Sequence, residues 1–245
     1  MIRVHALAAS DLVGVWERGM GQHPVDRALT ILSACSEEPW ETLARASVGR
    51  RDAALLAVYE RVVSRQLEAF AECPGCAEPL EYTLQVRDLL AEEEQREGAG
   101  ELAMTAGEIS LRLRLPNSLD LAAAASGDAS AAGQLLAERC ILDARSGSSA
   151  VPVQGLPAAI VEEAETRLAE ADPLAEVLID LECAACAHRW QAVLDIESFL
   201  WVKIGALAKR LLREVHVLAR AYGWREADIL AMSTARREFY LEMAS

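Results

Sequence analysis

The most constraining feature of this sequence is a short cysteine-containing segment that occurs twice. Residues 72–86 read ECPGCAEPLEYTLQV and residues 182–196 read ECAACAHRWQAVLDI, and the two align without a gap at an offset of 110 residues. The positions that correspond are Cys73 and Cys183, Cys76 and Cys186, Ala77 and Ala187, Leu80 and Trp190, Leu84 and Leu194, and Val86 and Ile196. The repeat predicts one small structural unit built twice in the same chain.

The four cysteines of the repeat have the chemistry of a zinc site. Each C-x-x-C turn offers two sulfurs on one side of a tight bend, and four thiolates suit tetrahedral zinc. The spacing between the two pairs is much longer than the roughly 15–20 residues usual in zinc sites, so the prediction rests on the repeat. We expect two knuckles that face each other about a pseudo-twofold axis and hold one structural zinc per chain. The predicted ligands are Cys73, Cys76, Cys183 and Cys186.

Other interpretations of the cysteines remain open. A thioredoxin-type redox dithiol sits at the start of a helix that follows a strand, whereas here a strand-like pattern follows each pair. The other alternative is a set of cysteines without metal, left from an ancestral site. His188 is interpreted as a neighbour and not a ligand, because four sulfurs already complete a zinc shell. Cys35 and Cys140 lie among apolar helical residues and are interpreted as buried packing groups.

Composition limits the class of protein. The chain has 245 residues, of which 52% are hydrophobic and 25% charged, as in ordinary globular proteins. It contains no apolar run of about 18 residues and no recognisable secretory signal, so we expect no membrane association and an intracellular protein with reduced thiols. The net charge of −14 makes nucleic-acid binding an unfavoured function, since affinity for phosphates comes mainly from Lys and Arg.

Hydrophobic periodicity predicts an α+β fold. Apolar residues at helical spacing fill the first seventy residues, with a long helix from Gly49 that runs directly into Cys73. Alternating patterns at residues 80–86 and 109–115 indicate strands. Residues 176–183 are interpreted as a strand and residues 188–196 as its return strand across the cysteine turn. A helix of about seven turns then runs from Ile196 to a stop at Gly223. We therefore predict helical N- and C-terminal parts around a small, mostly antiparallel sheet with a zinc-ribbon-like site. The expected division is 1–72, 73–196 with a helical insert at about 117–171, and 197–245, in one compact unit.

No catalytic signature is present in the sequence. Zincin, nucleophile-elbow, phosphate-loop and dinucleotide-binding motifs are all missing, and the four histidines show no paired spacing. A zinc held by four cysteines has no open position for water or substrate. We therefore expect no enzyme, no catalytic residue and no small-molecule substrate.

The C-terminal stretch, residues 211–243, resembles the end of the T4-like phage baseplate protein family. The likeness rests on Tyr222-Gly223-Trp224, Ile229-Leu230 and Arg236-Arg237…Tyr240-Leu241, with WERG at residues 16–19 and RLPNSLDL at residues 114–121. It implies a hub component or assembly factor in the baseplate of a contractile, phage-tail-like injection particle. The expected partners are other baseplate or hub proteins, and the expected location is the cytoplasm during assembly, with retention in the finished particle left open.

The same stretch suggests where a partner binds. Trp224, Arg236, Arg237 and Tyr240 are residue types that anchor interfaces, and this end of the chain is basic. We expect it to dock on an acidic neighbour. In the alternative interpretation the two aromatic side chains pack back on the long helix and the arginines are solvated. A second function left open is that of a zinc-ribbon adaptor in an unrelated multiprotein or nucleic-acid complex.

Overall fold

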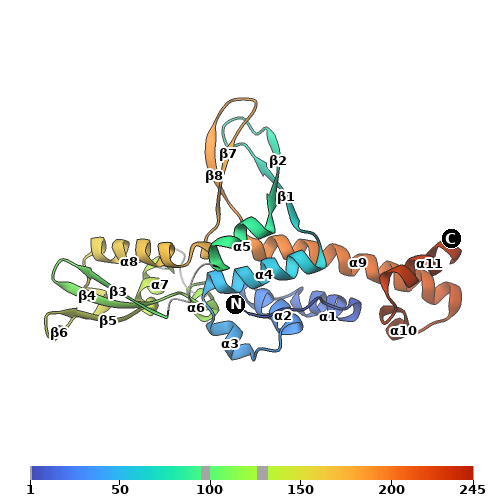
Figure 1. Ribbon diagram of the computed structural model, residues 1–245, viewed down its shortest axis with the longest axis horizontal. Coiled ribbons are helices and arrows are strands. Elements are labelled where there is room, and N and C mark those ends of the chain that lie inside the picture. Colours follow the sequence, from blue (N-terminus) through green and yellow to red (C-terminus); the bar gives the residue numbers. More distant parts are fainter. Residues whose placement is uncertain (1, 95–99, 126–131, 245) are drawn as a thin grey trace.

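The computed structural model describes residues 2–94, 100–125 and 132–244, and it confirms a mixed helical and antiparallel β fold. Its strands form three separate sheets (Figure 1), and not the single small sheet predicted from the sequence. Two of them are hairpins, β1 (Gln66–Glu72) with β2 (Pro79–Gln85) and β7 (Leu178–Glu182) with β8 (Arg189–Val193). The third has the order β3-β4-β5-β6. None of the helices in the described part is both long and apolar enough to cross a membrane.

The main core lies in a helical body at the centre of the molecule. The body consists of α1 (Ala9–Gly19), α2 (Pro24–Cys35), α3 (Trp40–Arg45), α4 (Val48–Val62), α5 (Val86–Glu94) and most of α9 (Ile196–Tyr222). The middle of α4 is buried on all sides, because Ala53, Ala54, Leu55 and Leu56 follow one another in the interior. A helix that is apolar all round belongs in a core and not at a surface, so the other helices pack around α4.

A buried carboxyl at the start of α9 predicts a pH effect. Glu197 is 4% exposed and lies 3.4 Å from Arg27 Nε. Burial raises the pKa of Glu197 from 4.5 to about 7, although Arg27 acts in the opposite direction. A raised folded-state pKa contributes stability at acid pH that is lost as the pH rises through 7. We expect Glu197→Gln to have a higher free energy of unfolding than the wild type at pH 8. Between about pH 4.5 and 8 its free energy of unfolding should also change less with pH than that of the wild type. Urea denaturation at each pH checks this, and parallel profiles for the two proteins would contradict it.

The long C-terminal helix forms as its sequence predicts. Asp195 caps α9 by accepting a hydrogen bond from the Ser198 backbone N–H at 3.0 Å. Gly223 ends the helix in the left-handed conformation, with φ of 69°, which glycine adopts without strain. Two short helices, α10 (Glu226–Leu230) and α11 (Thr234–Ala244), then fold back on its last turns (Figure 1).

A second lobe lies at the opposite end of the molecule from α10 and α11 (Figure 1). Its sheet contains β3 (Glu101–Ala106), β4 (Ile109–Arg114), β5 (Ile141–Ser146) and β6 (Ser149–Ala150). The helices α6 (Ser118–Ala125), α7 (Ala132–Cys140) and α8 (Ala158–Ala171) accompany it, and the short turns η2 (Val153–Gly155) and η3 (Pro173–Ala175) flank α8. This lobe has a small apolar core of its own, which includes Leu111, Leu113 and Cys140. The predicted three-part division of the chain stays a prediction.

The prediction that a helix runs into Cys73 is wrong. The helix α4 ends at Val62, and residues 66–72 form β1. Leu67 follows Val63 by four residues, which imitates helical spacing, but it is buried as one face of a strand whose neighbours are exposed. The Tyr59 hydroxyl donates to the Gln66 carbonyl at 3.1 Å and fastens the start of the strand to the helix. The repeat offset places residues 68–72 on residues 178–182, and this was the signal that could have identified β1.

Candidate metal centre

The two C-x-x-C turns have the same backbone geometry. We call residues 73–78 the first knuckle and residues 183–188 the second. In the first, Cys73 N–H donates to Glu78 O at 2.9 Å and Ala77 N–H to Cys73 O at 2.8 Å; the equivalent bonds of the second, from Cys183 to His188 and from Ala187 to Cys183, have the same lengths. Each knuckle closes an antiparallel hairpin, after Glu72 paired with Pro79 and after Glu182 paired with Arg189. The structural repeat predicted from the sequence is therefore present.

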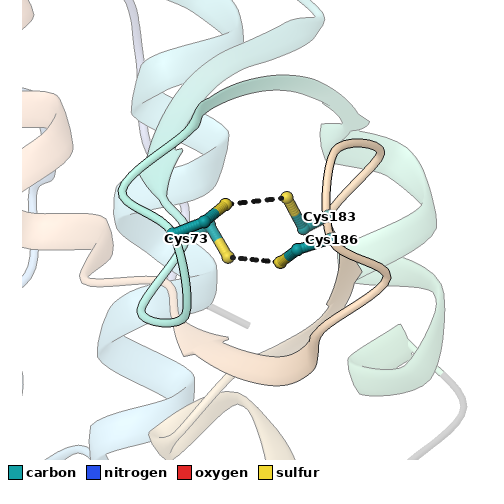
Figure 2. A group of neighbouring side chains, drawn as sticks. Cys73, Cys183 and Cys186 are labelled. Carbon is teal, nitrogen blue, oxygen red and sulfur yellow. Dashed lines mark hydrogen bonds between the residues drawn. The ribbon is translucent and has the colours of Figure 1, made fainter.

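The knuckles bring four sulfurs together. Cys73 Sγ lies 3.7 Å from Cys186 Sγ, and Cys76 Sγ lies 3.6 Å from Cys183 Sγ (Figure 2). All four sulfurs lie within 4.8 Å of one another. A disulfide would require about 2.05 Å, and the cysteines are free. Zn–S bonds of about 2.3 Å in a tetrahedron place sulfurs about 3.8 Å apart, so the four thiols fit the shell of a tetrahedral zinc ion.

Neighbouring groups shift the pKa values of Cys183 and Cys76 in opposite directions. A hydrogen bond from the backbone of Cys186 lowers the pKa of the Cys183 thiol to about 7, although desolvation acts in the opposite direction. A backbone hydrogen bond from Glu78 favours the Cys76 thiolate, but contact with Cys186 together with desolvation outweighs it and raises the pKa of Cys76 to about 12. The Cys76 thiol therefore stays protonated at neutral pH when no cation is bound. Metal uptake by such a cluster releases protons and weakens in acid.

The side chain of His188 and the backbone of Gly75 lie next to the sulfur cluster. His188 is outside the group of side chains that could hold a metal in the described chain. Its ring lies over Trp190, with 6.1 Å between ring centroids. A Cβ atom at Gly75 would lie 3.3 Å from His188 Cγ and 3.7 Å from Cys186 Sγ. The small residue at position 75 therefore lets the two knuckles approach closely.

One residue in each knuckle has a strained backbone. Ala77 and Ala187 have φ of 61° and 57°, the left-handed region that alanine adopts at a cost of about 1–2 kcal/mol. Glycine removes this strain but gains freedom in the unfolded chain worth about 0.4–1 kcal/mol. We expect Ala77→Gly and Ala187→Gly each to raise the free energy of unfolding by about 0.5–1 kcal/mol and to retain metal more firmly against a chelator. Ala71→Gly, within β1, is the matched control and should destabilise; the prediction fails if all three variants are weakened alike.

The paired hairpins, residues 66–85 and 178–193, project from the helical body as an arm with the cysteines at its tip (Figure 1). Only the base of the arm joins the main core, through Leu67, Leu84 and Ile179, together with Leu194 directly after β8. Farther out, Phe70 is 63% exposed. Because the hairpins form separate sheets, the tip is where a ligand shared by both could lock one to the other.

The four predicted interface residues lie at the other end of the long helix. Trp224 stacks on Tyr222 at 4.5 Å and meets Tyr240 edge to face at 4.8 Å, and Arg236 lies over the Tyr240 ring at 5.7 Å. Arg237 is only 4% exposed and donates to Glu214 at 2.9 Å. Trp224, Arg236 and Tyr240 thus share one partly exposed surface, whereas the Arg237 guanidinium faces inward. Their role in docking stays a prediction.

Comparison with known protein families gave a match over much of the chain. Residues 25–201 match the family model described as T4 bacteriophage base plate protein, and this range is well over half of the chain. The chain belongs to this family. The match confirms the resemblance inferred from the sequence. Most of that resemblance rested on residues 211–243, which lie outside the matched range. The segment RLPNSLDL at residues 114–121 lies inside the range. The matched range also contains both cysteine pairs of the chain. Searches of curated proteins and of solved structures gave no match.

Proposed function

We propose that the protein is a non-enzymatic structural or assembly component of the baseplate or hub of a contractile, phage-tail-like particle. In this proposal a zinc ion bound by Cys73, Cys76, Cys183 and Cys186 stiffens the projecting arm. Family membership supports the baseplate role. The convergence of four sulfurs from two distant hairpins is the observation that carries the zinc assignment.

Zinc would supply four metal–sulfur bonds that cross-link residues about a hundred positions apart. The two hairpins contribute few apolar contacts beyond the base of the arm, so a cross-link at the tip has a clear mechanical effect. An arm that stays rigid beyond its base is suited to contact a neighbour in a large assembly. We assign a second contact to the surface of Trp224, Arg236 and Tyr240, with Arg237 holding α11 in place from inside.

The assembly role can be tested in the cell that encodes the protein. Deleting the gene should abolish assembled particles in electron micrographs, and the wild-type gene should restore them. A gene with Cys186→Ser should restore fewer particles, because the arm loses its cross-link, whereas Cys35→Ala should restore normal numbers. Normal particle yield after the deletion would contradict the proposal. Mass spectrometry of purified particles separates a retained component from an assembly factor.

A further inference from the structure

The solvent-facing side of α9 carries only positive charge. At 100° per residue, Val202, Ala206, Lys209, Arg213, His216, Val217 and Arg220 lie within an arc of about 120° that runs about 27 Å along the helix, and all seven are exposed. We call this the α9 ridge. Both carboxylates of the helix, Glu197 and Glu214, are buried. A solvated helix in a protein with net charge −14 would be expected to intersperse acidic residues with these cations.

The ridge is unpaired as well as basic. Within the described chain, the ion pairs do not include Lys209, Arg213 or Arg220, although the neighbouring Arg210 binds both Glu214 and Glu238. Two apolar side chains interrupt the cations, since Val202 is 67% exposed and Val217 38% exposed. A surface with unpaired cations and exposed valines is complementary to a surface that carries carboxylates around apolar side chains.

Such a surface exists in the second lobe. A groove of about 360 Å³ between α7 and α8 has Val153, Leu156 and Val161 in its apolar lining and Glu138, Glu162 and Glu165 as its charged lining residues. The groove has no basic lining residue. Within the described chain, the ion pairs do not include these three carboxylates, and Glu162 and Glu165 are exposed. We call this the acidic groove.

The two surfaces cannot meet within one molecule. The acidic groove lies in the lobe at one end, and α9 runs from the body toward the opposite end (Figure 1). We propose that the α9 ridge of one copy binds the acidic groove of a second copy, so that the chains associate head to tail. An interface between two different patches closes into a ring or grows as an open chain, depending on the rotation between copies.

A second copy fits the ridge better than nucleic acid does. The ridge contains no Phe, Tyr or Trp side chain on which a base could stack, and its two valines interrupt the row of cations that would follow a phosphate backbone. The net charge of −14 on the whole chain repels a phosphate backbone. It also opposes self-association, but at physiological ionic strength charges more than about 8 Å apart are screened while contacting pairs still attract.

Analytical ultracentrifugation of the full-length protein tests the proposal. At about 0.15 M salt the wild type should show concentration-dependent association, which weakens at high salt as contact pairs are screened. Arg213→Glu on the ridge and Glu162→Arg in the groove should each weaken association at least about tenfold. An equimolar mixture of the two variants should associate again, because each still presents one native surface to the other. Arg50→Glu is the matched control, since Arg50 is an exposed arginine of α4 that belongs neither to the ridge nor to the groove lining, and it should behave as wild type.

Three results would overturn the head-to-tail contact. One is a wild-type protein that stays monomeric at every concentration tested, whether or not it binds duplex DNA. Another is association that neither charge reversal weakens. The third is failure of the mixed variants to associate although each one alone is weakened. None of these results depends on zinc or on the baseplate role, because every variant retains its cysteines and its C-terminal helices.

Discussion

Cys186→Ser should abolish metal binding and release both hairpins of the arm, although the substitution alters only the second. A structural zinc shell needs all four ligands, and zinc-finger peptides gain about 10–16 kcal/mol from their metal. Here the loss should be local, because the base of the arm is part of the main core and local opening does not require global unfolding. Elemental analysis should fall from one zinc per chain to none. Amide exchange should accelerate at least about 100-fold in both 66–85 and 178–193.

The control for this experiment is Cys35→Ala, which removes a buried thiol of α2 that is outside the sulfur cluster. This variant should keep its zinc and its slow exchange in the arm, even if the body is somewhat less stable. Treating the wild type with a chelator should reproduce the Cys186→Ser pattern. The zinc assignment fails if the purified wild type binds no metal or binds iron, or if exchange in residues 66–85 is unchanged in Cys186→Ser.

Asp120→Ala should destabilise the second lobe by about 3–5 kcal/mol, the usual cost of removing one partner from a buried charge network. The Asp120 carboxylate is fully buried and accepts hydrogen bonds from Arg114 and, at 2.7 Å, from Arg139. It also accepts the Asn117 backbone N–H at 3.0 Å. Burial alone would raise the pKa of Asp120, but the bonds from Arg114 and Arg139 hold it below its ordinary value. Its contribution is therefore present at neutral pH and lost as the pH falls through that lowered pKa.

Urea denaturation of Asp120→Ala measures the size of this effect. Amide exchange in residues 101–114 shows whether the loss of stability lies in the second lobe. The matched control is Asp143→Ala on the same sheet, which removes a partly exposed pair with Arg145 at 2.8 Å and should cost less than about 1 kcal/mol. Equal losses for the two variants would show that the Asp120 network adds nothing beyond a surface ion pair. The wild type should also lose more stability than Asp120→Ala on acidification.

The Asp120 network also explains why RLPNSLDL is a recognisable stretch. Arg114 ends β4 and Asp120 lies in α6, and Asn117 between them accepts hydrogen bonds from the backbone N–H groups of Leu119 and Asp120 and caps the helix. The carbonyl of Pro116 accepts the Val48 N–H at 3.0 Å, which fastens this turn to α4. The segment RLPNSLDL therefore joins the second lobe to the helical body, a role that its sequence alone did not indicate.

Local sequence determined the parts of this protein that depend on neighbouring residues. The cysteine turns, the strands that follow them and the stop of α9 at Gly223 all follow from patterns of a few residues, since turn geometry and side-chain period are local properties. The ungapped repeat added one long-range fact, that two equivalent knuckles exist, and from their equivalence the joint sulfur cluster could be predicted. Applied to residues 68–72, directly before the first cysteine, the same offset would also have identified β1.

Only the tertiary structure determined which charged residues are buried and which strands pair with one another. Leu67 satisfies a helical and an alternating pattern equally, and only its pairing with Leu84 makes it part of a strand. Arg237 has the same sequence character as Arg236, yet one is buried against Glu214 and the other is exposed. The separation of the strands into three sheets and the projection of the arm likewise depend on contacts between residues far apart in the chain. Burial is a property of the partners that a residue meets, and a local pattern does not contain those partners.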